Sequence, residues 1–567
     1  MPQATRSPFS PQALRFETLV DHGYTPPEHP VGTKLGFFNA NPFSTGIANL
    51  GYQCVADYLI QRGVNVYFAF ADTMNGRAFL NLDIPPCEVD LIAISVPFED
   101  TYLNVLRMLK GAGLPIYARE RGSDFPPVII GGMAMINPLP LQEFGDVFVI
   151  GEGRETLYEI VRRFDLCRKH YDKQEFLQAI ADLPGVYIPS HFHIRLDADG
   201  YVDEFRAIYG SETIVANPPL PLDAYPIHSI WTSRYSCYEY DDYFSLMIAM
   251  GCNMKCPYCV VGNTQTDKSG RALISNADQC VEIALNRRER YGTNLIKLFF
   301  SSAFHGSLQS NAQELKSLLE ILLAHGFQAR VGSLNIEQGD DELFRLLKAH
   351  GQTKVTFAPE SVESLRPSIN KEYITDKKLH NLAKLASKHD MDMTLYTLGG
   401  LPGENTTHSV QLVQLLRSLR RELKPACRLE IHYNSTIMKA QTPFQFCSTV
   451  RPETIRRRYQ ILKEGLSDLA NIQIVSIIDD PMCYFQPILA LGDSQVGQVL
   501  AHLYTKADVT EADWRSAFPE LGLSDQHYFR PKDPDRRLPW EHIVYSNHSL
   551  LKRRLVSLAR KSGPSPS

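Results

Sequence analysis

Residues 251–259, with the sequence Gly-Cys-Asn-Met-Lys-Cys-Pro-Tyr-Cys, hold three cysteines in the spacing C-x3-C-x2-C. They follow an apolar run at residues 244–250 that is typical of a buried strand. Three thiolates on one short loop can bind three irons of a [4Fe–4S] cluster, because such clusters take cysteine sulfur ligands. The fourth iron would then have no protein ligand and would be open to a substrate. The spacing therefore predicts an iron–sulfur site formed by Cys252, Cys256 and Cys259.

A structural zinc site is the alternative explanation for these cysteines. Structural zinc usually takes four ligands in paired C-x2-4-C spacings. No second pair follows this loop, and the other cysteines stand singly along the chain. The spacing favours the iron–sulfur interpretation.

The composition is that of an ordinary globular protein, with 567 residues, 44% hydrophobic and 21% charged residues. The formal net charge of -5 gives no reason to expect nucleic acid as a partner. The N-terminus lacks the apolar stretch of a signal peptide, and no run of 18 apolar residues predicts a membrane span. Eleven cysteines without a disulfide-like framework indicate a reducing, cytoplasmic setting.

Strands alternate with helices before the cysteine loop, which predicts a parallel α/β sheet. The expected strands lie at residues 34–40, 66–71, 90–96, 127–132 and 146–150. Glycines follow two of them, namely Gly131, Gly132, Gly151 and Gly153. Because open α/β sheets bind ligands at the carboxyl ends of their strands, these glycines are candidates for close approach of a ligand.

Strands alternate with helices again from residue 244 onward, and this alternation predicts a partial (βα)6 barrel. The expected strands lie at residues 244–250, 295–300, 329–334, 354–358, 393–398 and 428–433. Active groups of such barrels gather at the carboxyl ends of the strands. The candidates at those ends are Ser301, Ser302, Asn335, Glu337, Glu360, Ser361, Gly399 and Gly400.

The cysteine loop resembles that of the radical S-adenosylmethionine (SAM) enzymes, in which SAM chelates the open iron of the cluster. Residues 357–361 and 398–404 also resemble the fourth-strand and fifth-strand segments of the methylthiotransferase-like branch. The resemblance implies that a set of residues binds SAM: Tyr258, Ser301, Ser302, Asn335, Glu360, Ser361, Gly399 and Gly400. A carboxylate such as that of Glu360 suits ribose hydroxyls, although it could instead sit at a helix N-terminus.

The first part of the chain resembles the cobalamin-binding domain that precedes the barrel in many radical SAM enzymes. The resemblance is carried by Ser95, Gly131-Gly132 and residues 149–157, and it implies a Rossmann-like fold. Cobalamin is a further candidate cofactor, held near Ser95, Gly131, Gly132, Gly151 and Gly153. Residues 133–138 depart from the family pattern, and the Asp-x-His-x-x-Gly motif is absent, so a scaffold without cobalamin is the alternative.

The resemblance covers residues 35–555 and extends to radical SAM proteins with a fused B12-binding-type domain. We expect a mobile N-terminus over 1–33, the Rossmann-like domain over 34–170, and a β-rich linker over 171–235. The radical SAM barrel is expected over 236–450, followed by a C-terminal helical extension over 451–567. The fold class is therefore α/β with a mixed C-terminal extension.

Several activities are compatible with these features. The first is transfer of a carbon group from SAM, with methyl carried by cobalamin, to a small-molecule substrate. The second is cobalamin-independent transfer of the 3-amino-3-carboxypropyl group, as in arsinothricin biosynthesis, with Cys427, Cys447 or Cys483 holding an acceptor such as arsenite. The third is a non-catalytic Fe–S sensor. Modification of a tRNA or protein would follow the methylthiotransferases, but no basic domain supports nucleic-acid binding. The radical reactions imply a reducing partner such as flavodoxin or ferredoxin.

Overall fold

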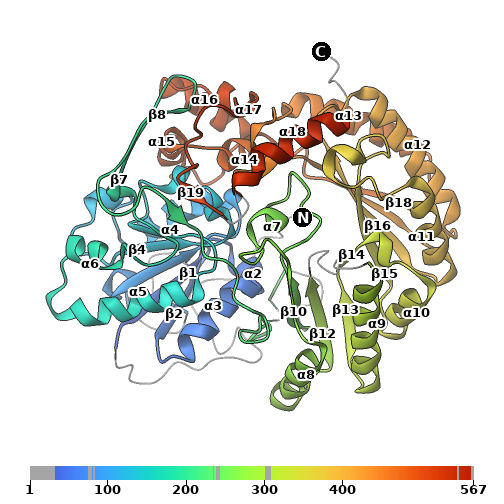
Figure 1. Ribbon diagram of the computed structural model, residues 1–567, viewed down its shortest axis with the longest axis horizontal. Coiled ribbons are helices and arrows are strands. Elements are labelled where there is room, and N and C mark those ends of the chain that lie inside the picture. The colour runs from blue at the N-terminus through green and yellow to red at the C-terminus, as the bar shows by residue number, and fades with distance from the viewer. Residues whose placement is uncertain are drawn as a thin grey trace.

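The computed structural model describes residues 32–73, 79–80, 84–233, 235–237, 243–300, 308–545 and 548–562. The predicted mobile segment at the N-terminus lies almost wholly outside these residues. Figure 1 shows two α/β parts side by side, with helices of the C-terminal part across one end of both. No helix within the described ranges is both long and apolar enough to span a bilayer.

The first part is a six-stranded sheet in the order β2-β1-β3-β4-β5-β6. Its strands are β1 (Lys34–Asn39), β2 (Asn65–Phe70), β3 (Leu91–Ser95), β4 (Val128–Gly131), β5 (Val147–Val149) and β6 (Val186–Tyr187). The first five are parallel, and β6 is antiparallel to β5. The order 2-1-3-4-5 is a doubly wound order in which the direction of winding reverses between β1 and β3.

Both faces of this sheet are buried, which explains the nearly continuous apolar character of its strands. One face packs against α3 (Leu50–Ile60), α5 (Arg154–Cys167) and α6 (Lys173–Ile180). The other face packs against α4 (Tyr102–Gly111) and against α14 (Met482–Ala490), α15 (Ser494–Leu503) and α16 (Glu511–Glu520). The C-terminal helices therefore complete the core of the first sheet.

The second part is a curved wall of two mostly parallel sheets, β11-β10-β12-β13 and β14-β15-β16-β17-β18, and its parallel strands follow one another in chain order. They are β10 (Phe244–Met250), β12 (Leu295–Phe300), β13 (Gln328–Val331), β14 (Ser333–Leu334), β15 (Lys354–Glu360), β16 (Asp392–Gly399), β17 (Leu429–Ser435) and β18 (Ile472–Val475). The short β11 (Leu273–Ile274) is antiparallel to β10 at one edge. Gly332 separates β13 from β14, so the third expected strand occurs as two pieces that pair with different neighbours.

Helices α8 (Ala277–Tyr291), α9 (Leu308–Ala324), α10 (Asp341–Ala349), α11 (Asp376–Lys388), α12 (Thr406–Glu422) and α13 (Pro452–Leu466) connect these strands. Their apolar faces share one core with alternate residues of the strands. The mixed α/β fold and the six expected barrel strands are confirmed. The sheet also continues past residue 450, where we expected the barrel to end, because β18 pairs with β17.

The segment between the two parts is more than a linker. The predicted hairpin is present as β7 (Phe192–Leu196) and β8 (Val202–Ala207). However, β6 joins the first sheet, and β9 (Ile214–Val215) pairs with the C-terminal β19 (Ile543–Val544). These pairings tie residues 171–235 to both ends of the chain.

Candidate functional site

The cysteine loop lies at the carboxyl end of β10 and leads directly into α7 (Val260–Thr264). The side chains of Cys252 and Cys256 are buried, and that of Cys259 is half-buried. Burial raises the pKa of the Cys252 and Cys256 thiols to about 11 and also raises that of Cys259. Bound iron would stabilise the thiolates against this effect, because metal ligands bind deprotonated.

Backbone and side-chain contacts fix the shape of this loop. The Nδ2 of Asn263 in α7 donates to the carbonyls of Cys256 (3.1 Å) and Cys259 (2.8 Å). Gly251 has φ +79°, and a Cβ there would lie 2.2 Å from the carbonyl oxygen of Gln265. Lys255 also has a positive φ of 49°, unusual for a residue other than glycine. The chain is therefore bent to turn three cysteines toward one region.

The described residues contain no group of three or more His, Cys, Asp or Glu side chains placed to hold a metal ion. The three thiols nevertheless influence one another's pKa, which places them in mutual electrostatic range. A multi-iron cluster spreads its ligands over several metal atoms, one thiolate to each iron. This arrangement of the three thiols is compatible with a cluster.

Glu360 lies beside the cysteines in a buried network. Its Oε1 accepts hydrogen bonds from the Tyr258 hydroxyl (2.8 Å) and from the Lys371 Nζ (2.8 Å). Glu360 ends β15 with a φ of +64°, at a point where the strand register shifts. A strained backbone at a buried carboxylate is typical of a functional site. Glu360 is not at a helix N-terminus, because the next helical segment is the 3-10 turn at Arg366–Ile369.

Lys371 is the cation of this network, and its Nζ also donates to the Ala358 carbonyl (2.6 Å). Burial alone would lower the pKa of Lys371, but Glu360 and Cys256 raise it above its ordinary value. Lys371 in turn lowers the pKa of all three cysteines. A buried positive charge therefore lies next to the place where thiolates would carry negative charge.

Asn335 and Ser361 lie near the same network. The Nδ2 of Asn335 donates to the Tyr373 hydroxyl (3.3 Å). Burial raises the pKa of Tyr373 to about 12, and Lys371, Cys256 and Cys252 make smaller contributions to it. Ser361 is buried, and its carbonyl accepts a bond from Arg366. Glu337 instead forms an ion pair with Lys378. The predicted Ser301 and Ser302 lie outside the described residues.

The glycine turn after β16 is fixed by its surroundings. A Cβ on Gly399 would lie 2.3 Å from the Tyr433 hydroxyl, and Gly400 has φ +89°. The Glu404 carboxylate accepts bonds from the amides of Gly400 and Leu401 and pairs with Arg458 (2.9 Å). Leu401 and Leu398 share an apolar cluster with Tyr258, so this turn borders the cysteine loop.

The candidate cobalamin residues lie at the carboxyl edge of the first sheet. Ser95 pairs in register with Gly131, and both are half-buried. Gly132 and Gly151 are exposed with positive φ, and a Cβ on either would meet backbone, at Val96 and Asn217 respectively. The chain's own packing thus requires these two glycines, while their exposed backbones leave the edge open. The remaining candidate, Gly153, makes only ordinary contacts.

The structure does not gather the candidate acceptor cysteines. Cys427, Cys447 and Cys483 lie on separate elements and are not gathered into a metal-binding group within the described ranges. Residues 133–138, in contrast, meet the barrel: the Gln265 side chain donates to the Met133 sulfur (3.1 Å). The edge of the first sheet and the cysteine loop therefore face each other.

Sequence reasoning missed four residues that position the loop: Asn263, Gln265, Lys371 and Arg554. Arg554 lies in α18 (Leu551–Ser562), and its Nη1 donates to the Oδ1 of Asn263 (2.7 Å). Lys371 follows the fourth strand by eleven residues, and its contact with Glu360 depends on the turn between them. No sequence signal connects Arg554 to a loop almost 300 residues away.

A barrel whose first strand leads into a three-cysteine loop, with a buried carboxylate at its fourth strand, defines the class of radical SAM proteins. Comparison of the chain with family models gives the same class. The model of the radical SAM superfamily matches residues 246–416, and the model of radical SAM proteins, N-terminal, matches residues 77–189. The chain belongs to the radical SAM superfamily and is a radical SAM enzyme.

Solved structures resemble the chain in fold. The radical SAM methyltransferase TsrM from Kitasatospora setae, with cobalamin and a [4Fe–4S] cluster bound, has a TM-score of 0.51 at 14% identity. The match covers 94% of this chain and 100% of that one. TsrM with tryptophan and a SAM analogue bound has a TM-score of 0.48 at 14% identity, and the match covers 74% of this chain and 78% of that one. The cobalamin-dependent enzyme OxsB has a TM-score of 0.45 at 12% identity, and the match covers 77% of this chain and 57% of that one. No curated protein matches the chain.

Proposed function

We propose that this chain is a transferase that cleaves SAM with a [4Fe–4S] cluster held by Cys252, Cys256 and Cys259. The observation that carries the proposal is the gathering of these thiols beside Glu360 and Lys371. Three thiolates supply three ligands, and Lys371 offsets part of their negative charge. The open iron is then available to the amino and carboxylate groups of SAM.

Glu360 suits the ribose of SAM. Both of its hydrogen bonds go to Oε1, and within the described part of the chain its Oε2 makes none. A ribose hydroxyl can donate to Oε2 without breaking either existing bond. Tyr258 and Lys371 would hold the carboxylate still while it does so. The glycine turn at Gly399-Gly400 borders Tyr258 and would pass beside the adenosine.

A corrinoid fits the open edge of the first sheet, near Ser95, Gly132 and Gly151. The exposed glycine backbones allow a flat ligand to approach closely, and Met133 beside them contacts Gln265 at the end of α7, the helix that follows the cysteine loop. The fold likeness to cobalamin-bound TsrM spans both parts of the chain and supports this assignment. When bound, the cluster supplies an electron that breaks a carbon–sulfur bond of SAM, and the corrinoid carries methyl to the acceptor.

We infer that the acceptor is a small molecule and that a flavodoxin- or ferredoxin-type protein supplies the electrons. The Rossmann-like domain (34–170), the barrel (236–450 with β18) and the C-terminal helices would each contribute to the enclosed site. Methyl transfer to carbon consumes one SAM for the methyl group and a second SAM for hydrogen abstraction. The products are then S-adenosylhomocysteine, 5′-deoxyadenosine, methionine and the methylated acceptor.

The test is identification of the nucleoside products by mass spectrometry, after anaerobic cluster reconstitution with SAM, dithionite and hydroxocobalamin. We expect S-adenosylhomocysteine together with 5′-deoxyadenosine. Methylthioadenosine instead would overturn the methyl assignment in favour of aminocarboxypropyl transfer. An intact cluster with no SAM cleavage would leave only the sensor hypothesis.

Alanine variants test the cluster ligands. Replacing Cys252, Cys256 or Cys259 should abolish both the absorbance near roughly 400 nm and all SAM cleavage, because a thiolate ligand is lost. Cys87→Ala is the matched control, since Cys87 is exposed and distant in sequence from the loop. Full SAM cleavage in the triple variant is the result that would contradict the assignment.

A further inference from the structure

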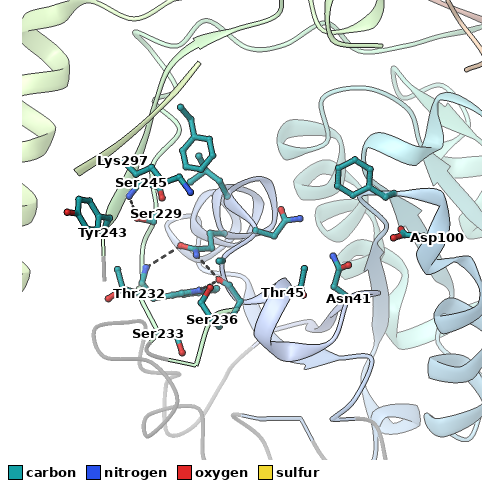
Figure 2. A pocket seen from close by; sticks show the side chains of 18 residues that line it. Asn41, Thr45, Asp100, Ser229, Thr232, Ser233, Ser236, Tyr243, Ser245 and Lys297 are labelled. Carbon is teal, nitrogen blue, oxygen red and sulfur yellow. Dashed lines mark hydrogen bonds between the residues drawn. The ribbon is translucent and has the colours of Figure 1, made fainter. Parts of the chain in front are cut away.

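A cavity of about 320 Å³ lies where the first sheet meets the barrel, apart from the cysteine loop. Asn41, Thr45 and Asp100 come from the segments after β1 and β3 (Figure 2). These two strands are the neighbours between which the winding of the sheet reverses. Open α/β sheets bind ligands at this switch point, outside the carboxyl ends of the strands. The volume is at the small end of the range for ligand pockets.

The opposite wall belongs to the barrel. Phe244, Leu246, Ile296 and Leu298 point to the helices that surround the sheet, because they are part of the barrel's outer core. Side chains alternate along a strand, so Ser245 and Lys297 point the other way, to the inner face. Both line the cavity, and Figure 2 shows them across it from Asn41 and Asp100. The cavity therefore extends along the inner face of the barrel from the first half of β10 and β12, where Ser245 and Lys297 lie.

The end of the cavity at Asp100 carries negative charge that is only partly compensated. Its Oδ1 is buried and has no hydrogen-bond partner among the described residues. Neighbouring Glu99 uses both carboxylate oxygens to bind the Lys439 ammonium (2.5 and 2.6 Å). Two carboxylates thus share one cation. A buried acceptor without a hydrogen bond destabilises the folded protein. A ligand with a positively charged donor would remove that cost.

The middle and the far end of the cavity have a different character. Trp231 and Phe299 line it with aromatic surface, and Phe98 lies at its wall with 55% of its surface exposed. Lys297 brings positive charge at the barrel end, beside the hydroxyls of Ser245 and Tyr243. The lining therefore runs from negative, through apolar, to positive.

We propose that this cavity binds the acceptor substrate, and that the substrate is an elongated amine. Its ammonium group would bind Asp100, its apolar body would pack against Trp231 and Phe299, and an anionic end would face Lys297. The role as acceptor rests on the proposed function, whereas the charge order of the ligand rests on the cavity alone.

The test is equilibrium binding of 3-[4-(aminomethyl)phenyl]propanoate, followed by tryptophan fluorescence. Of the three tryptophans, Trp231 lines the cavity, while Trp514 and Trp540 are buried elsewhere, so Trp231→Phe should remove the signal. We expect the N-acetylated probe to bind at least about tenfold more weakly than the amine, the loss of one charged hydrogen bond. Asp100→Asn should abolish this difference, and Lys297→Met should abolish the preference for the acid over its methyl ester.

Asp535→Asn is the matched control, because Asp535 is an exposed carboxylate outside the cavity lining. Equal binding by wild type and Asp100→Asn would overturn the proposal, as would displacement of the probe by hydroxocobalamin. SAM cleavage is measured in parallel on the wild type. SAM cleavage by a protein that does not bind the probe would rule out the cavity as the acceptor site and leave the proposed function standing. Probe binding that depends on Asp100, without cleavage, leaves the ligand class intact and removes the acceptor role.

Discussion

Lys371 illustrates how a single buried residue can hold the candidate site together. Its side chain and that of Glu360 are each less than a tenth exposed, and the pair is 2.8 Å apart. Removing one partner of a buried pair leaves an uncompensated charge, which costs about 3–5 kcal/mol. We therefore expect Lys371→Met to lower the free energy of unfolding by that amount and to abolish SAM cleavage. Lys371→Arg should restore part of both.

Urea unfolding and the nucleoside assay measure these effects. Lys388→Met is the matched control, because Lys388 pairs with Asp341 at the surface, where both side chains are more than half exposed. Exposed ion pairs of this kind contribute little to the free energy of unfolding. Equal unfolding midpoints for the two variants would mean that the Lys371–Glu360 pair does not support the site.

Asp100 makes stability depend on pH. Burial and then Glu99 raise its pKa from 3.8 to about 6. The folded protein therefore binds this proton more tightly than the unfolded chain, and the contribution of Asp100 to stability falls as pH rises from about 4 to 6. Asp100→Asn removes the charge, so it should gain about 3 kcal/mol over wild type at pH 8 and roughly half that at pH 5. Urea unfolding at the two pH values measures the gain, and a gain independent of pH would contradict the assignment.

At the scale of elements, the turn after β16 depends on a close approach between two strands. A Cβ on Gly399 would lie 2.3 Å from the Tyr433 hydroxyl on β17. Overpacking of this kind costs about 1–3 kcal/mol, and we expect Gly399→Ala to destabilise the protein accordingly. Tyr433→Phe removes the nearest atom and should recover part of the loss in the double variant.

Gly332→Ala is the control for this turn, because a Cβ at Gly332 would meet no atom within 4 Å. Thermal unfolding of the four variants gives the coupling between positions 399 and 433. Strict additivity of the two single changes would show that the contact does not restrict Gly399.

The elements that sequence could predict are those whose signal is local. The apolar runs of β3 and β10 and the spacing of the three cysteines are contained within a few residues. The strand β18 was missed because its four residues, Ile-Gln-Ile-Val, carry no long apolar run and are defined by pairing with β17. The partners of Glu360 were missed for a related reason, since Tyr258 approaches it across 102 positions of sequence. Contacts of this kind follow from the packing of elements rather than from any one of them.

At the scale of the whole molecule, the cysteine loop is the point where the three parts of the chain meet. Gln265 joins it to Met133 of the first sheet, and the Pro257 carbonyl accepts a bond from the Phe444 amide (3.0 Å) beyond β17. Arg554 reaches it from the C-terminal helix α18, which lies across the end of the barrel (Figure 1). Loop geometry therefore depends on the docking of segments far apart in sequence.

Arg554 allows this dependence to be measured. It donates to Asn263 Oδ1, while Asn263 Nδ2 holds the carbonyls of Cys256 and Cys259. A hydrogen bond to a charged group contributes about 1.5–3 kcal/mol, so its loss should make the cysteine loop open roughly tenfold more often. We expect Arg554→Met to release iron about tenfold faster to a chelator, followed by the absorbance of the cluster. The neighbouring Arg553→Met is the control, because Arg553 is exposed. Equal release rates in the two variants would mean that α18 covers the loop without holding it, and that the loop keeps its shape through α7 alone.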